Sequence, residues 1–155
     1  ALKSLKAKFG YCFEAAPGSG YPPILNGHEL AEPFAPLAIH GAGGTISVEA
    51  FGVGHGRIRS LGFRIGPLAY CPDVDVLGED GFAALEGVEC WIVDALRHRP
   101  HPTHAHLGRT LDWIARVRPK RAILTNMHVD MDYLALRREL PPGVEPAYDG
   151  MSVLL

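Results

Sequence analysis

Residues 54–75 read GHGRIRSLGFRIGPLAYCPDVD, and this stretch decides the fold. Polar and apolar residues alternate through it, and glycine separates the alternating runs, which predicts short antiparallel strands joined by tight turns. The preceding run, ISVEAFGV over residues 46–53, has the same alternation. The sequence therefore predicts an antiparallel meander with strands over residues 46–53, 57–65 and 67–73.

The second part of the chain has the pattern of alternating strands and helices. VECWIVDA, over residues 88–95, has the length and β-rich apolar content of a strand covered on both faces. The other predicted elements are an amphipathic helix over residues 103–117, a strand over 121–126, a helix over 132–140 capped by Asp130, and two short strands within 144–155. A meander followed by this alternation predicts an α/β sheet with helices packed outside.

The amino-terminal residues 1–45 are rich in proline and glycine and poorly periodic, as in GSGYPPILNG and HGAGG. They predict irregular segments with at most short strands. The total of 155 residues, 47% of them hydrophobic, is the size of one ordinary domain. We therefore expect a single domain over residues 1–155, in which residues 1–45 form an irregular, insert-like region.

Charge, hydropathy and cysteine content limit the class of protein. The formal net charge is −2 and the basic residues form no run, so a nucleic-acid partner is possible but not indicated. No apolar run approaches the ~20 residues of a membrane span, and the first residues lack a signal-peptide core. Cys12, Cys71 and Cys90 are isolated, which fits a reducing compartment and disfavours a cysteine zinc site. These observations predict a cytoplasmic protein without a membrane partner.

Four polar clusters follow predicted strands or precede predicted helices, and they centre on His55, Asp73, His104 and His128. Taken singly, His55 fits a turn, and Asp73 fits a turn or a helix cap. His104 falls at a predicted helix start, where free N–H groups favour an anion, although a buried histidine bonded to a carbonyl is an equal alternative. Taken together, histidine and carboxylate side chains from separate strands are the ligands that Zn²⁺, Mn²⁺ or Fe²⁺ prefers.

Residues 54–75, the string DALRHRPHPTHAHLGRTLDWI over 94–114, PKRAILTNMH over 119–128 and PAYDGM over 146–151 together resemble metallo-β-lactamase-fold hydrolases. The similarity is to relatives of the cyclic-phosphate phosphodiesterase of phosphonate breakdown and, more distantly, of the transfer-RNA processing ribonuclease Z. It spans residues 46–155. The resemblance implies an α/β (α+β) fold, the αββα sandwich, with this chain covering roughly its second half.

The resemblance also implies roles for individual residues. His55 matches a metal-binding histidine of the family, and Asp73 matches the aspartate that bridges two metals, so these two side chains are predicted to converge. His104 matches the histidine beside the substrate phosphate, where imidazole stabilises charge or acts as a general acid. Asp94, at the end of the strand over residues 88–95, is expected to orient a ligand histidine.

Two departures from the family pattern concern the metal ligands. The last ligand of the phosphodiesterase pattern directly follows the threonine, where this chain has Asn126. Residues two apart in an extended chain point to the same side, so we expect His128 as the metal ligand and Asn126 as a supporting residue beside it. The family's HxHxDH motif is absent from the sequence and is expected before Ala1. The chain alone is therefore expected to bind metal weakly and to lack activity.

These inferences predict a metal-dependent hydrolase that cleaves phosphodiesters of cyclic-phosphate or nucleotide type through two divalent ions, Zn²⁺, Mn²⁺ or Fe²⁺. The expected partner is a small-molecule phosphodiester, and a homo-oligomer is an open alternative to a monomer. Two other functions fit the same sequence. One is a non-catalytic binding or assembly module, and the other is a hydrolase of this fold that acts on a thioester or lactone.

Overall fold

The computed structural model describes residues 2–154, which form two compact units divided between Ala35 and Pro36. The first unit contains two short helices and an extended segment, and the second contains the sheet. None of the helices in the described residues combines the length and hydropathy of a membrane-spanning segment.

Two helices at the start of the first unit, α1 (Leu2–Lys8) and α2 (Gly10–Phe13), correct the expectation of irregular structure with at most short strands. The sequence of α1 is LKSLKAK, which is dominated by residues of high helix propensity and contains neither glycine nor proline. The extended segment that follows packs back on α2. The backbone amides of Ile24 and Leu25 both donate to the carbonyl oxygen of Cys12, at 3.0 and 2.9 Å.

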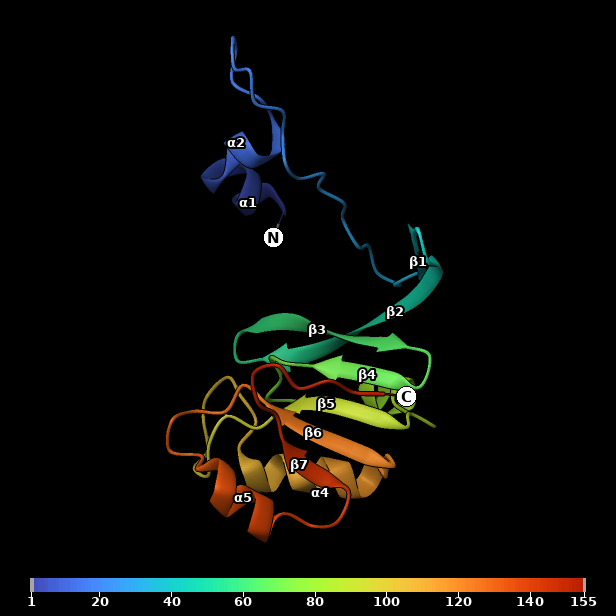
Figure 1. Ribbon diagram of the computed structural model, residues 1–155, viewed down its shortest axis with the longest axis vertical. Helices are drawn as coiled ribbons and strands as arrows, with labels where there is room; N and C mark the ends of the chain where they lie inside the picture. The colour runs from blue at the N-terminus through green and yellow to red at the C-terminus, as the bar shows by residue number, and fades with distance from the viewer. Residues whose placement is uncertain (1, 155) are drawn as a thin grey trace. The chain divides into compact units, whose positions relative to one another are not determined.

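One seven-stranded sheet forms the second unit, and its strands lie side by side in sequence order (Figure 1). The strands are β1 (Leu37–Gly41), β2 (Gly44–His55), β3 (Ile58–Ile65), β4 (Leu68–Cys71), β5 (Cys90–Asp94), β6 (Arg121–Thr125) and β7 (Val144–Pro146). Neighbours from β1 to β4 are antiparallel, and neighbours from β4 to β7 are parallel. The predicted meander and the later alternation of strands and helices are confirmed.

The helices of the second unit are α3 (Glu79–Ala84), α4 (Leu107–Val117) and α5 (Tyr133–Glu139). The predicted start of α4 at residue 103 is wrong, because His106 has an extended backbone and its ring accepts a hydrogen bond from the backbone amide of Arg109 as the helix cap. The predicted cap of α5 is also wrong. The carboxylate of Asp132, not that of Asp130, accepts from the backbone amide of Ala135, at 2.7 Å.

The carboxy-terminal stretch contributes one strand, β7, and not the two short strands that its sequence predicts. After Pro146 the chain bends, and the backbone amide of Met151 donates to the carbonyl oxygen of Tyr148 at 3.0 Å. Residues 151–154 pair with no strand of the sheet. Apolar composition alone is therefore insufficient to form a strand there, because a strand needs a neighbouring strand that accepts and donates its backbone hydrogen bonds.

The core lies on one face of the sheet, under α3 and α4. Trp91 on β5 and Leu124 on β6 are fully buried there, and Leu111 of α4 packs against them. Phe63 of β3 and Tyr70 of β4 are paired in register on the opposite face, where both are partly exposed. The sheet therefore has one face covered by helices and a second face that is open in part.

Candidate functional site

Four strands end at the same edge of the sheet, and the polar clusters lie at this edge. β2 and β4 both pair antiparallel with β3, so they run in the same direction, and β4, β5 and β6 are parallel. Their carboxyl ends therefore meet at one edge, which is the usual place for a ligand site in such sheets. His55 ends β2, Asp73 follows β4, and His104 lies in the loop after β5.

His55, Asp73 and His104 form one group, in which ligand atoms of the three side chains lie within 4.8 Å of one another. The predicted convergence of His55 and Asp73 is confirmed. The imidazole rings of His55 and His104 meet edge to face with centroids 4.7 Å apart, and Asp73 Oδ1 lies 4.0 Å from His104 Nδ1. Two imidazoles and a carboxylate fit a transition metal such as Zn²⁺, Mn²⁺ or Fe²⁺.

His55 is held in a defined orientation by the loop before α4. Its Nδ1 lies 2.7 Å from the carbonyl oxygen of Thr103. A carbonyl oxygen only accepts, so the proton is on Nδ1 and Nε2 keeps a lone pair for a ligand. Next to it, the backbone amide of Gly56 donates to Asp75 Oδ1 at 3.1 Å, which fixes the turn between β2 and β3.

Asp94 positions His104. Asp94 ends β5 and is fully buried, and its Oδ2 accepts from His104 Nδ1 at 2.7 Å and from the backbone amide of Val74 at 3.3 Å. Burial raises the pKa of Asp94, and these two hydrogen bonds oppose part of that rise. The sequence predicted that Asp94 orients a metal-ligand histidine, whereas the histidine that it contacts is His104, which was predicted to act beside the substrate phosphate.

The position of His104 corrects one part of its sequence-based interpretation. His104 was expected in the first turn of a helix, but α4 begins only at Leu107, so His104 lies in the preceding loop. The free N–H groups at the start of α4 therefore do not lie at His104, where the sequence predicted an anion site. Its side chain is instead placed by Asp94 and by the edge contact with His55.

The structure brings Asn126, and not His128, to the group. Asn126 Nδ2 lies 3.2 Å from His104 Nδ1 and 3.5 Å from Asp94 Oδ1. His128 lies on the surface, and its Nδ1 is 2.8 Å from Asp130 Oδ1. The chain is not extended here, because Asn126 has a φ of 60°, so the argument that placed both side chains on one side does not hold. A metal-ligand role for His128 stays a prediction.

Three further contacts of the site were not found from the sequence. The carbonyl of Thr103 binds His55, and the hydroxyl of Thr110 donates to the backbone oxygen of Asp94 at 2.6 Å. The ring of His101 lies with its centroid 5.3 Å from that of His104. Desolvation lowers the pKa of His101, and the positive charge of Arg97 adds to this shift. The density of histidines in HRPHPTHAH was the one signal for such a cluster.

Comparison with known proteins identifies the family. Residues 1–127 match the model of the β-lactamase superfamily domain. The chain therefore belongs to the metallo-β-lactamase superfamily, and both the predicted family and the predicted metallo-β-lactamase-type α/β fold are confirmed.

Two solved structures are similar to this chain over most of its length. A crystal structure described as a new diphosphatase from the PhnP family has a TM-score of 0.85 and 25% identity, over 99% of this chain and 55% of that one. The metallo-β-lactamase fold protein YhfI from Bacillus subtilis has a TM-score of 0.63 and 15% identity, over 78% of this chain and 53% of that one.

One curated relative is named for an acyl-transfer reaction and not for hydrolysis. The octanoyltransferase of Porphyromonas gingivalis is 24% identical over an alignment of 159 positions, which covers 99% of this chain and 30% of that protein. The chain thus spans about a third of the curated relative and about half of the diphosphatase.

Proposed function

We propose that these residues belong to a metal-dependent hydrolase that cleaves phosphodiesters through a dinuclear metal site. The observation that carries the proposal is the group of His55, Asp73 and His104 at the carboxyl edge of the sheet. Similarity to the diphosphatase over 99% of the chain supports a reaction at phosphorus. The substrate in this proposal is a small molecule, of cyclic-phosphate or nucleotide type.

In this proposal His55 and Asp73 hold metal, and an HxHxDH motif in the complete protein supplies the remaining ligands. Bound divalent ions would polarise the phosphoryl oxygen and supply a hydroxide nucleophile at neutral pH. The chain on its own offers only three ligand side chains in this group, so we expect residues 1–155 alone to bind metal weakly and to lack turnover.

His104 is proposed as the general acid. Its Nδ1 is engaged by Asp94 Oδ2 at 2.7 Å, so a proton carried on Nε2 can pass to the leaving oxygen of the diester. Asp94 is buried and keeps the ring in one orientation, as an aspartate does for a catalytic histidine in other hydrolases. Asn126 Nδ2 lies 3.5 Å from Asp94 Oδ1, and so supports the carboxylate that orients this ring.

A thioester or lactone hydrolase is the second candidate, because one curated relative is named an octanoyltransferase. The match covers only 30% of that relative. A separate region of the relative can therefore account for acyl transfer. A non-catalytic module is disfavoured by the buried Asp94 behind His104, since a buried carboxylate is costly where it serves no chemistry.

The test uses the complete protein that contains these residues, loaded in turn with Mn²⁺ and Zn²⁺. Hydrolysis of bis(p-nitrophenyl) phosphate is compared with hydrolysis of p-nitrophenyl octanoate and of an octanoyl thioester. We expect turnover of the diester, with loss of turnover and of bound metal in His55→Ala and Asp73→Ala. Cleavage of the thioester or octanoate without cleavage of the diester would overturn the proposal in favour of the second candidate.

A further inference from the structure

A hollow of about 610 Å³ lies directly beside the candidate site, between the turn that joins β2 to β3 and the loop before α4. His55 lines both this hollow and the group of metal-ligand side chains. The volume of the hollow is in the range of small-molecule binding sites. A molecule whose reacting phosphate is at His55 can therefore extend into it.

Two contacts fix the walls of this hollow. The ring of His55 is bonded to the carbonyl oxygen of Thr103 at 2.7 Å, so the turn and the loop are tied together. Gly56 has a φ of +63°, and a Cβ atom there would lie 2.5 Å from Thr103 Cγ2. The turn thus approaches the loop as closely as a glycine permits, which makes the hollow a preformed part of the fold.

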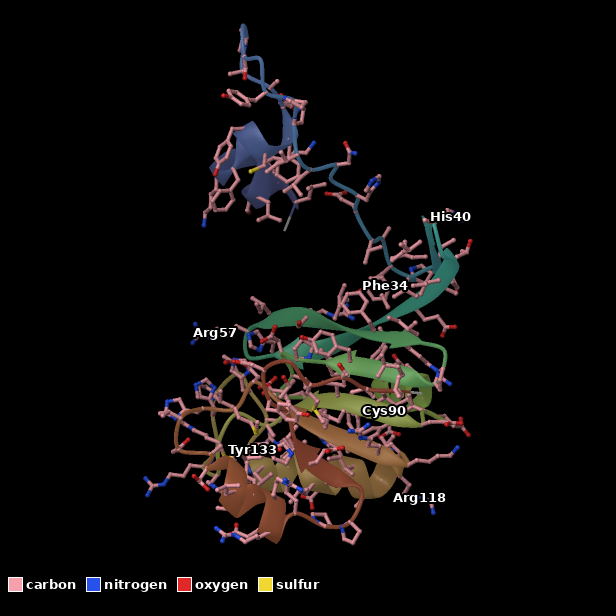
Figure 2. All side chains as sticks on the ribbon, in the orientation of Figure 1. Phe34, His40, Arg57, Cys90, Arg118 and Tyr133 are labelled. Carbon is pink, nitrogen blue, oxygen red and sulfur yellow. The ribbon has the colours of Figure 1, made fainter. Side chains whose placement is uncertain are left out.

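Two apolar side chains, Ile58 and Pro102, line the hollow together with Arg57 and the polar side chains of His55, Asp75 and Thr103. Ile58 is 64% exposed, and Pro102, which faces the same space from the loop, is also exposed. Arg57 is exposed at the turn, and its guanidinium makes no hydrogen bond or ion pair with any residue of the range 2–154. Asp75 is occupied by the backbone amide of Gly56. Figure 2 shows Arg57 at the end of the sheet where the loops after β5 and β6 also lie.

We propose that this hollow binds the organic arm of the phosphodiester substrate, and that this arm is of nucleotide type. A flat ring lies against Ile58 and Pro102, and Arg57 binds a second phosphate carried by the same arm, because guanidinium groups bind phosphate oxygens in a bidentate manner. The inference rests on the proposed function, since it places the reacting phosphate at His55. It assigns a substrate-binding role to Arg57 and Ile58 and narrows the substrate class to nucleotides.

A second hollow, of about 510 Å³, is lined by Asn126 and by residues 147–151, and its side chains have a different chemistry. Tyr148 and Asp149 line it, and no arginine or lysine does. A carboxylate without a cation disfavours a second phosphate. The hollow at Arg57 is therefore the one that suits a charged organic arm.

The first test measures binding to the metal-free complete protein, by titration calorimetry and by amide chemical shifts in NMR spectra. The probes are adenosine, AMP, ADP and inorganic phosphate. We expect ADP to bind most tightly and to shift the amides of Gly56, Ile58 and Thr103. Ile58→Ser should weaken AMP and ADP binding by roughly tenfold, and Arg57→Gln should remove most of the preference for ADP over AMP, with partial recovery in Arg57→Lys.

Matched controls use exposed residues of the same type outside the hollow. Ile39→Ser on β1 controls for Ile58→Ser, and Arg138→Gln on α5 controls for Arg57→Gln. Neither control should change ADP binding. Equal ADP binding by all four variants, or shifts confined to residues 147–151, would overturn the inference.

The second test separates this inference from the proposed function. The loaded protein is assayed with methyl p-nitrophenyl phosphate and with the p-nitrophenyl ester of thymidine monophosphate, which share a leaving group. Ile58→Ser should raise KM for the thymidine ester alone, by roughly tenfold. If both esters are cleaved and the variant affects them equally, the proposed function stands and the inference fails. If neither ester is cleaved but the binding results hold, the hollow stands and the proposed reaction fails.

Discussion

Asp94 Oδ2 lies 2.7 Å from His104 Nδ1, and the Asp94 side chain is fully buried beneath that ring. Burial raises the pKa of Asp94, which means that the folded chain holds the ionised carboxylate at an energetic disadvantage. In our proposal, this cost in stability positions the general acid His104. The pair is thus the point in the fold where stability and activity should respond in opposite directions.

Asp94→Asn is predicted to lower kcat by at least about 100-fold while leaving the free energy of unfolding at pH 7 unchanged or higher. An amide keeps the shape and can still accept from His104, but it removes the buried charge. Steady-state kinetics and thermal unfolding check the two halves. A variant that is both active and less stable would show that Asp94 is only a structural residue.

His104→Ala is predicted to lower kcat by ~10²–10⁴-fold in the loaded complete protein, because a general acid contributes that much to proton transfer. Metal content should fall little, since in our proposal His55 and Asp73 hold the ions. Metal analysis alongside the kinetics distinguishes the two roles. Loss of metal in proportion to activity would make His104 a ligand, which its distance to the other two side chains also permits.

The structure predicts that substitution of Asn126 affects activity and that substitution of His128 does not. Asn126→Ala should lower turnover, because its amide nitrogen lies 3.5 Å from the Asp94 carboxylate that orients His104, and should leave metal content near that of the wild type. His128→Ala should change neither quantity by more than about twofold while its ring remains paired with Asp130. If His128→Ala loses metal, His128 leaves Asp130 in the complete protein and the original ligand assignment is restored.

Gly56→Ala is predicted to reduce turnover and stability, and Gly66→Ala is its matched control. Both glycines have a positive φ in a turn of the meander, at 63° and 55°, so both variants carry a backbone cost of roughly 1–2 kcal/mol. Only at Gly56 would the new Cβ also meet a neighbour, 2.5 Å from Thr103 Cγ2. Equal loss of turnover in the two variants would contradict a role for the close approach of turn and loop.

Cys71 is predicted to resist alkylation in the folded protein. Burial raises its pKa to about 12 from an ordinary value of 9.0, so the thiol stays neutral at pH 8, where iodoacetamide should modify the half-buried Cys12 first. The raised pKa also predicts a loss of stability as the pH rises from 9 towards 12, because only the unfolded chain ionises there. Peptide mass spectrometry after timed labelling measures the first effect, and unfolding curves across that pH range measure the second.

The sequence was sufficient to predict the sheet and the meeting of His55 and Asp73. Alternation and apolar runs report directly on which residues are buried, and the direction of neighbouring strands then places their ends together. The start of α4 was missed by sequence periodicity, because the extended backbone of His106 interrupts a pattern that looks continuous. Asn126 could not be placed either, since its left-handed φ reverses the side on which the next residues lie.

The buried apolar residues of the sheet and the proposed metal ligands occupy separate positions along the strands and their loops. The middle of the sheet carries residues such as Trp91 and Leu124, which are fully buried, whereas His55 and Asp73 lie at or beyond strand ends. Natural variation can therefore replace the segments that select a substrate without repacking the interior. Descendants of one such scaffold can diverge in what they act on while their architecture stays the same.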